Sequence, residues 1–223
     1  MHNGFRVAEA GRALPRPPHT EFLGLPFCLL SQQQVVRHII EQAGTPFRYI
    51  VTPNAYHVVM AHDEPARLLP VYRGAWLSLC DSRIVRALAA FNGQVLPLVG
   101  SDLVAALLSA LDVHGTPSSP QRLLVVGPAA SVVTILGAAY PNLAFDVVPA
   151  PGNLAHDAEQ RLAIARACMD RDWDTLLLCV DSPAQELIAY QLAELGCASG
   201  IALCAGTAID CSTGRRSRAP LSA

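Results

Sequence analysis

The sequence predicts an α/β protein with a mainly parallel β-sheet and helices on both faces. Short apolar runs alternate along the chain with segments of helical periodicity. The strongest runs are apolar along their whole length, as strands covered on both faces are. Hydrophobic residues make up 52% of the 223 residues and charged residues only 15%, which is enough for one sizeable core and excludes extensive disorder.

The first half of the chain alternates strand and helix patterns. Ser31 and Gln34 form a capping box that begins a helix with an apolar face. The residues that follow predict a strand at Phe47–Thr52, a helix toward His62, a strand at Ala75–Cys80, and helices at Arg83–Phe91 and Ser101–Leu111.

The second half repeats the alternation. The stretch from Leu123 to Phe145 is uncharged and long enough for a membrane span, but Gly127-Pro128 and Pro141-Asn142 favour strand, helix and strand instead. The expected elements are strands at Leu123–Gly127, Ala144–Val148, Thr175–Val180 and Gly200–Ala205, and helices from Ala129, over Asp157–Met169 and from Pro183. Ligands of such sheets bind beyond the carboxyl ends of the strands, so the turns at 52–54, 81–82, 127–128 and 181–183 should border the site.

Composition and missing motifs exclude several functions. All sixteen basic residues are arginine, which rules out Schiff-base lysine chemistry and a P-loop lysine. The net charge of −2 gives no global basic field, so we expect no nucleic-acid partner. No GxGxxG follows a strand, which makes a dinucleotide oxidoreductase remote.

The cysteines and histidines indicate no metal site. Seven cysteines form no CxxC, and the seven histidines lack metal-ligand spacing, so we expect neither a structural zinc nor a cofactor. Free thiols suit a reducing, cytoplasmic compartment. We interpret residues 1–20, which lack an apolar core stretch, as a loose tail, and residues 21–223 as a single domain.

Five segments, in order, carry a resemblance to a known family. They are VTPNAYHVVMAHDEP (Val51–Pro65), LCDSRIVRAL (Leu79–Leu88), VGSDLVAALL (Val99–Leu108), SPAQELI (Ser182–Ile188) and CAGTAIDCSTGRRSRAP (Cys204–Pro220). With GLPFCLLSQQQVV from Gly24, which looks like an opening hairpin and first helix, they resemble the WecG/TagA/CpsF glycosyltransferases. The resemblance covers nearly the whole chain beyond the tail and implies a Rossmann-like domain.

The resemblance implies an inverting, metal-independent transfer of a hexose-type sugar. The donor would be a UDP-sugar, and the acceptor a polyprenyl-diphosphate-linked saccharide at the inner face of the cell membrane during surface polysaccharide assembly. Asp81 matches the candidate general base, which takes the proton of the acceptor hydroxyl. From local sequence alone, Asp81 could instead cap the helix that begins near Arg83.

The same resemblance implies the other site residues. Gln185 matches a second catalytic position, at the mouth of a helix. The residues that match substrate-binding positions are Thr52, Asn54, Gly100, Asp102, Glu186 and Asp210. Five of these residues have a structural alternative: turn chemistry for Thr52 and Asn54, helix capping for Asp102, and a polar first turn for Gln185 and Glu186.

Four positions depart from the family pattern. Ser82 replaces the glycine after the catalytic aspartate, and Pro97 replaces an arginine that would contact the departing diphosphate. Asp181 stands in the lead into the PKQE segment, where its charge opposes that of UDP, and Ala184 replaces the lysine. These departures favour, as the alternative function, a degenerate family member that acts as a nucleotide-binding or scaffolding subunit.

The carboxyl-terminal segment is short for the family. Three arginines, Arg215, Arg216 and Arg218, could bind anionic lipid headgroups or form a solvated basic tail. The thin arginine complement for a diphosphate suggests that a partner subunit is required, and the apolar composition permits a homo-oligomer.

Overall fold

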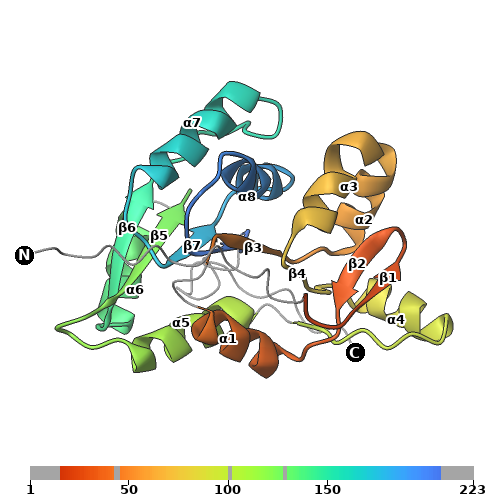
Figure 1. The fold of residues 1–223 in the computed structure, drawn as a ribbon, viewed down its shortest axis with the longest axis horizontal. Coiled ribbons are helices and arrows are strands. Elements are labelled where there is room, and N and C mark those ends of the chain that lie inside the picture. The colour runs from red at the N-terminus through yellow and green to blue at the C-terminus, as the bar shows by residue number, and fades with distance from the viewer. Residues whose placement is uncertain (1–15, 43–45, 100–101, 128–129, 207–223) are drawn as a thin grey trace, which may run out of the picture.

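The central element of the fold is a six-stranded, all-parallel sheet with strand order β4-β3-β8-β7-β5-β6 (Figure 1). The computed structural model describes residues 16–42, 46–99, 102–127 and 130–206. The strands of this sheet are β3 (Arg48–Val51), β4 (Leu77–Ser78), β5 (Gln121–Val126), β6 (Leu143–Val148), β7 (Thr175–Leu178) and β8 (Ile201–Cys204). The predicted α/β class with a parallel sheet is therefore confirmed.

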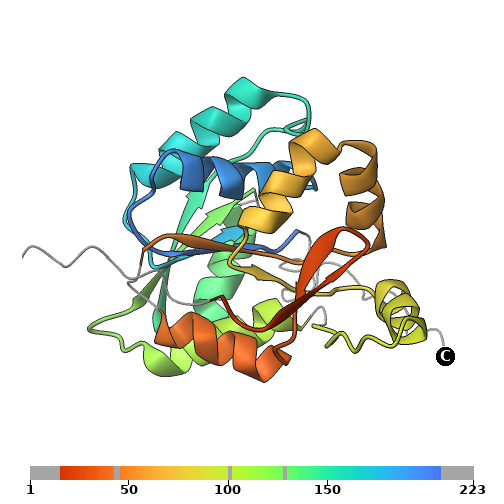
Figure 2. The ribbon, with the colours of Figure 1, turned by 45° about the vertical axis from the view of Figure 1, so that its right-hand side comes forward.

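Helices cover both faces of the sheet, as Figures 1 and 2 show. One face packs against α2 (Ala55–Asp63), α3 (Pro65–Gly74), α4 (Arg83–Phe91), α7 (Ala158–Met169) and α8 (Ala184–Glu194). The other packs against α1 (Gln32–Glu41), α5 (Leu103–His114) and α6 (Ala130–Ala139). Two separate hydrophobic clusters result, one on each side of the sheet.

Alternation along the central strands explains why these strands are apolar throughout. In β5, Leu124 and Val126 belong to one cluster, whereas Leu123 and Val125 belong to the other. Successive side chains of a strand point to opposite faces, so a strand covered on both sides needs an apolar residue at every position. The same pattern recurs in β7 and β8.

The segment that could be mistaken for a membrane span forms β5, α6 and β6. The glycine and proline breaks lie between these elements, and β5 and β6 pair in parallel from Gln121–Leu143 to Val126–Val148. Strand, helix and strand is thus the correct interpretation. In the described part of the chain, no helix combines the length and the apolarity that crossing a bilayer requires.

Two elements were not fully expected from local sequence patterns. The first is α3, which begins with Pro65 at the end of α2 and fills the space between two expected elements. The second is a hairpin of β1 (His19–Phe22) and β2 (Leu25–Cys28), so ordered structure begins inside the segment 1–20 interpreted as a tail. The backbone oxygens of Arg73 and Ala75 accept hydrogen bonds from Arg16, which holds this end of the chain against α3.

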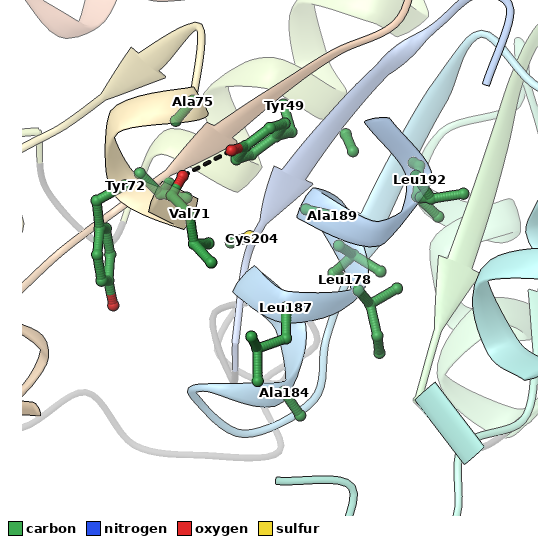
Figure 3. Close-up of a cluster of buried hydrophobic side chains, with 14 of the residues drawn as sticks. Tyr49, Val71, Tyr72, Ala75, Leu178, Ala184, Leu187, Ala189, Leu192 and Cys204 are labelled. Atoms are coloured by element: carbon green, nitrogen blue, oxygen red, sulfur yellow. Dashed lines mark hydrogen bonds between the residues drawn. The ribbon is translucent and has the colours of Figure 1, made fainter. Parts of the chain in front are cut away.

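Helix α3 is fixed to the sheet by a buried tyrosine. The hydroxyl of Tyr49, on β3, donates to the backbone oxygen of Val71 at 2.6 Å (Figure 3). Figure 3 also shows that Tyr72 extends past Val71 toward the same end of the cluster as Ala184, the first residue of α8. This packing brings α2, α3 and the start of α8 together at the carboxyl ends of the strands.

Candidate active site

The carboxyl ends of β3 and β4 place Asp81 beside the 52–54 turn. The backbone nitrogen of Leu79 donates to Val51 at 2.8 Å, and the nitrogen of Asp81 donates to the oxygen of Pro53 at 3.1 Å. On the other side of β4, Val99 donates to the oxygen of Cys80 at 2.9 Å. Three segments that are far apart in the sequence therefore meet at Asp81.

The carboxyl group of Asp81 does not cap α4. Ser82 is the N-cap residue, and its hydroxyl accepts a hydrogen bond from the nitrogen of Val85 at 3.2 Å. Among the described residues, no side chain or backbone group hydrogen-bonds the Asp81 carboxyl group. Ser82 thus performs the capping that Asp81 could otherwise have performed, and leaves the carboxylate available.

The surroundings of Asp81 change its acidity. The residue keeps a solvent-exposed surface. Desolvation by the protein around its carboxyl group raises its pKa from 3.8 to about 6, although the nearby His57 acts in the opposite direction. A carboxylate with this pKa is mostly ionised at neutral pH and is a stronger base than an ordinary aspartate.

We predict that Ser82→Ala lowers the free energy of unfolding by about 1 kcal/mol, because the first turn of α4 loses its cap. Ser82→Gly should cost only a few tenths of a kcal/mol, because glycine is tolerated at a helix N-cap. Urea denaturation of the two variants measures the difference. Equal stability of Ser82→Ala and wild type would contradict the assignment of Ser82 as the cap.

Asn54 and His57 form a reciprocal cap at the start of α2. The side-chain oxygen of Asn54 accepts from the nitrogens of Tyr56 at 2.9 Å and His57 at 3.3 Å. In return, Nδ1 of His57 accepts from the nitrogen of Asn54 at 3.1 Å. Nδ1 also lies 2.8 Å from the side-chain oxygen of Asn54, and Nε2 faces Glu186.

Glu186 is a buried carboxylate at the centre of a polar cluster. It is 1% exposed on the first turn of α8, and its Oε1 lies 3.2 Å from Nε2 of His57. That contact is within ion-pair distance but is not a hydrogen bond. The hydroxyl of Ser182 donates to Oε2 at 3.0 Å, and Nε2 of Gln185 donates to Oε1 at 3.0 Å.

Gln185 connects this cluster to the end of β8. It is 4% exposed, and its Oε1 accepts from the nitrogen of Gly206 at 2.8 Å. Thr52 makes a second connection, since its hydroxyl donates to the oxygen of Cys204 at 3.1 Å. Hydrogen bonds within the chain therefore hold Thr52, Gln185 and Glu186 at the same end of the sheet.

Tyr72 closes the cluster from α3. Its hydroxyl is fully buried and interacts electrostatically with Glu186 and with the side chain of Ser182. Burial raises its pKa, so the hydroxyl stays neutral. The rings of Tyr72 and His57 meet edge to face with centroids 6.4 Å apart. His57 is thus held between an aromatic ring, a helix cap and a carboxylate.

A second feature of the same sheet edge is a crevice between β5 and β7. The connection after β5 passes through α6 on one face, whereas that after β7 passes through α8 on the other. Such a reversal leaves a gap that ligands of open α/β sheets occupy. A cavity of about 260 Å³ lies at this edge, lined by the 150–155 loop, the 179–181 segment and Ala184.

Gly127 lets the backbone pass closely through this crevice. Its φ is +107°, and a Cβ atom there would lie 2.7 Å from the oxygen of Cys179 and 2.8 Å from Cγ1 of Val180. Any larger residue would push the ends of β5 and β7 apart. That Gly127 borders a ligand site stays a prediction.

The remaining predicted residues divide into two groups. Asp102 is exposed at the N-cap position of α5 and makes no side-chain cap. Val99 lies beside Cys80, so the segment that leads to Asp102 starts next to β4. Gly100, Asp210, Arg215, Arg216 and Arg218 lie outside the described residues.

Sequence reasoning missed His57, Ser182 and Tyr72. The spacing of Asn54 and His57 is that of a capping box, which would have predicted that the histidine turns back toward the strand end. No sequence pattern predicts that Tyr72 contacts this site, because helix α3 itself was not expected.

No group of three or more His, Cys, Asp or Glu side chains within the described ranges is arranged to hold a metal ion. The six cysteines there are free thiols.

A carboxylate with a raised pKa at the strand ends of an α/β sheet is suited to an enzyme that removes a proton from a substrate hydroxyl. Residues 20–223 match the family model described as Glycosyl transferase WecG/TagA/CpsF family, and the chain belongs to that family. Membership supports a role in glycosyl transfer for polysaccharide biosynthesis, with a sugar-nucleotide donor and a glycan acceptor. A search of curated proteins finds no match.

Proposed function

We propose that the protein transfers a hexose-type sugar from a UDP-sugar to a polyprenyl-diphosphate-linked saccharide, with inversion and without a metal ion. The observation that carries this proposal is the carboxylate of Asp81. It caps no helix, is partly desolvated and has a pKa of about 6. The family match supports the class of reaction.

In the proposed step, the carboxylate of Asp81 takes the proton of the acceptor hydroxyl. The acceptor oxygen forms a bond to the anomeric carbon of the donor sugar. The bond between that carbon and the β-phosphate oxygen breaks, and UDP leaves with the electron pair. A single displacement of this kind inverts the anomeric centre.

We place the nucleotide of the donor in the crevice between β5 and β7. The sheet order puts β4 three strand spacings from β7, which is about 14 Å. An extended nucleoside-diphosphate sugar spans such a distance, so its sugar end can reach Asp81. Thr52, Asn54 and Asp102 then lie on the sugar side, and Gly100 and Asp210 keep the donor-binding roles that the resemblance implies.

Gln185 and Glu186 act, in this proposal, mainly as positioning residues. Both are buried, and the polar atoms of Gln185 are hydrogen-bonded inside the protein. Glu186 holds His57, and His57 stabilises the ionised form of Asp81. The cluster thereby tunes the base without touching the transferred sugar.

Calorimetric titration with UDP and a panel of UDP-sugars, without added metal, tests the donor site. We expect UDP to bind and one sugar nucleotide to bind more tightly. Asp181→Asn should tighten UDP binding severalfold, and more so at low salt, because a negative charge beside the crevice is removed. The control is Asp172→Asn, which should leave the affinity for UDP unchanged. The side chain of Asp172 is 95% exposed and lies near the amino end of β7, away from the crevice.

The departures at Asp181 and Ala184 favour one other function, a nucleotide-binding or scaffolding subunit without activity. Asp181 and Ala184 both line the crevice cavity, so they alter the place proposed for the nucleotide. Binding of UDP without turnover of any UDP-sugar, with or without membranes, would favour this function. Absence of UDP binding at millimolar concentration would contradict the nucleotide-binding subunit and a donor site in the isolated chain, and would favour the scaffolding subunit or an enzyme whose site a partner or membrane completes.

A further inference from the structure

Two arginines from different helices hold the 150–155 loop, which lines the cavity at the crevice. Arg67, on α3, donates from Nη2 to the backbone oxygen of Ala155 at 2.7 Å. Arg161, on α7, donates from Nη1 to the same oxygen at 3.0 Å and also to the backbone oxygen of Leu154. We call Arg67 and Arg161 the arginine clamp.

The arginine clamp lies beside the cavity but does not line it. Helices α3 and α7 lie on the same face of the sheet, with α8 between them (Figures 1 and 2). Ala155 lines the cavity together with Ala184, the first residue of α8, whereas neither arginine does. A single peptide unit therefore separates the guanidinium groups from a ligand that touches the 154–155 backbone.

Arg161 is a buried cation without a carboxylate partner. It is 7% exposed, forms no ion pair with a described residue, and its Nε has no hydrogen-bond partner among those residues. Burial and the neighbouring charge of Arg67 lower the pKa of Arg161, whereas Asp157 opposes both effects. A guanidinium group nevertheless stays protonated in a protein, so a buried positive charge remains beside the loop.

The acids near the arginine clamp are less buried than Arg161. Glu64 pairs with Arg67 at 2.7 Å and is exposed, and Asp181 is exposed at the cavity. Asp157 is half-buried and caps α7, where its Oδ1 accepts from the backbone nitrogen that begins the helix hydrogen bonding. Solvent screens exposed charges more than buried ones, so Arg161 has the largest effect on the potential at the loop.

The loop that the clamp orients also offers backbone donors. A trans peptide unit points its C=O and N–H in opposite directions, so the N–H of Ala155 points away from Arg161. Within the described ranges, no group accepts a hydrogen bond from the backbone nitrogens of Gly152, Asn153, Leu154 or Ala155. Asn153 has a φ of +67°, and left-handed residues of this kind occur in backbone concavities that bind anions.

We infer that the arginine clamp enables the crevice to bind the phosphate groups of the nucleotide. Of the described residues that line the cavity, Asp181 is the one with a charged side chain, and it repels phosphate. The buried charge of Arg161 offsets that repulsion from behind the loop, and the loop amides supply hydrogen bonds. Arg67 and Arg161 are thus positioning residues, which act through the 154–155 backbone.

This inference deepens the proposed function and rests on it, because it needs the nucleotide in the crevice. The structural alternative is that the clamp only holds the loop in place. The two roles differ for ligands with and without phosphate. A clamp that acts by charge affects the binding of UDP much more than that of uridine, whereas a merely structural clamp affects both equally.

Calorimetric titration of the full-length chain with UDP and with uridine tests the inference. Arg161→Met should weaken UDP binding about tenfold at low salt, as expected for a unit charge about 10 Å from the phosphates at a dielectric constant of about 20. The affinity for uridine, which is uncharged, should change less than about twofold. The loss for UDP should shrink as ionic strength rises. Arg161→Lys keeps the charge and should recover most of the affinity for UDP.

Two further variants complete the test. Arg67→Gln removes the half-buried member of the clamp and should weaken UDP binding about threefold, since solvent screens this charge in part. It decides the question even if urea denaturation shows that Arg161→Met does not fold. Arg166→Gln, at an exposed position of α7, is the matched control and should bind UDP like wild type. Equal losses for UDP and uridine in the clamp variants would overturn the inference.

Turnover separates this inference from the proposed function. UDP binding that no clamp variant weakens would overturn the inference and leave the proposed donor site standing. UDP binding that depends on the clamp, without transfer of a sugar to any acceptor, would overturn the proposed function while the phosphate site stands. Turnover of a UDP-sugar by a wild-type chain that binds neither UDP nor inorganic pyrophosphate in the titration would overturn the inference alone.

Discussion

Replacement of Asp81 by asparagine should reduce kcat about 10²- to 10⁴-fold, which is the usual contribution of a positioned general base. Asparagine has nearly the same shape but cannot accept the proton of the acceptor hydroxyl. The carboxyl group of Asp81 receives no hydrogen bond from the described residues and caps no helix, so the fold should tolerate the change. The affinity for UDP should stay within a factor of about two, since the base acts on the acceptor.

Stability provides a control for the Asp81→Asn variant. The pKa of Asp81 is raised from 3.8 to about 6 in the folded protein, so its stabilising contribution is full below pH 3.8 and is lost as pH rises through about 6. At pH 8 the variant should therefore be at least as stable as wild type. Asp63→Asn, at the exposed end of α2, should leave turnover unchanged. Full activity of Asp81→Asn would remove Asp81 from the mechanism.

Glu186→Ala should lower the free energy of unfolding by about 3–5 kcal/mol, as expected when one partner of a buried ionic contact is removed. The side chain is 1% exposed, and its loss leaves the hydroxyl of Ser182 and Nε2 of Gln185 without their acceptor. It also removes the carboxylate that faces His57 at 3.2 Å. Urea denaturation at pH 7.5 measures the effect.

A double-mutant cycle gives the sharper form of this prediction. The loss in free energy of unfolding for His57→Ala/Glu186→Ala should be at least about 1 kcal/mol smaller than the sum of the losses for the two single variants. Each single variant leaves the other buried side chain without its partner, whereas the double variant removes both. Glu194→Ala, exposed at the end of the same helix, should cost less than about 0.5 kcal/mol. Additive single variants would show that His57 and Glu186 do not stabilise each other.

The fold was largely predictable because its strands are apolar throughout. A strand such as β7, with four buried residues in succession, is distinguished from a solvent-facing strand by composition alone. The breaks at Gly127 and Pro141 separated β5, α6 and β6 for the same kind of local reason. Order of the strands in space was not predictable, since β7 and β8 insert between β5 and β3 through contacts distant in sequence.

Element boundaries were less predictable. The expected strand at 75–80 is reduced to Leu77–Ser78. Beyond its carboxyl end, the nitrogen of Leu79 still donates to the oxygen of Val51, and the oxygen of Cys80 accepts from the nitrogen of Val99. Helix α3 contains Pro70 and is separated from α2 by the single residue Glu64. These two features hid the helical periodicity of the 65–74 segment.

The candidate site was predictable in part. Strand-end reasoning brought Thr52, Asn54 and Asp81 to one edge, and the structure places them there. It could not show that Ser82 rather than Asp81 caps α4, because either residue can accept the same bond. Nor could it show that Glu186 is buried, since that burial depends on His57 and Tyr72 from two other helices.

The pH dependence of kcat with saturating UDP-sugar and acceptor tests the central claim most directly. A base must be ionised to act, so wild-type kcat should rise with pH through an apparent pKa near 6, the value that the surroundings of Asp81 impose. The residual activity of Asp81→Asn should lack this rise. A wild-type profile that is flat between pH 4.5 and pH 7.5, or the same rise in Asp81→Asn, would contradict the assignment of Asp81 as the base.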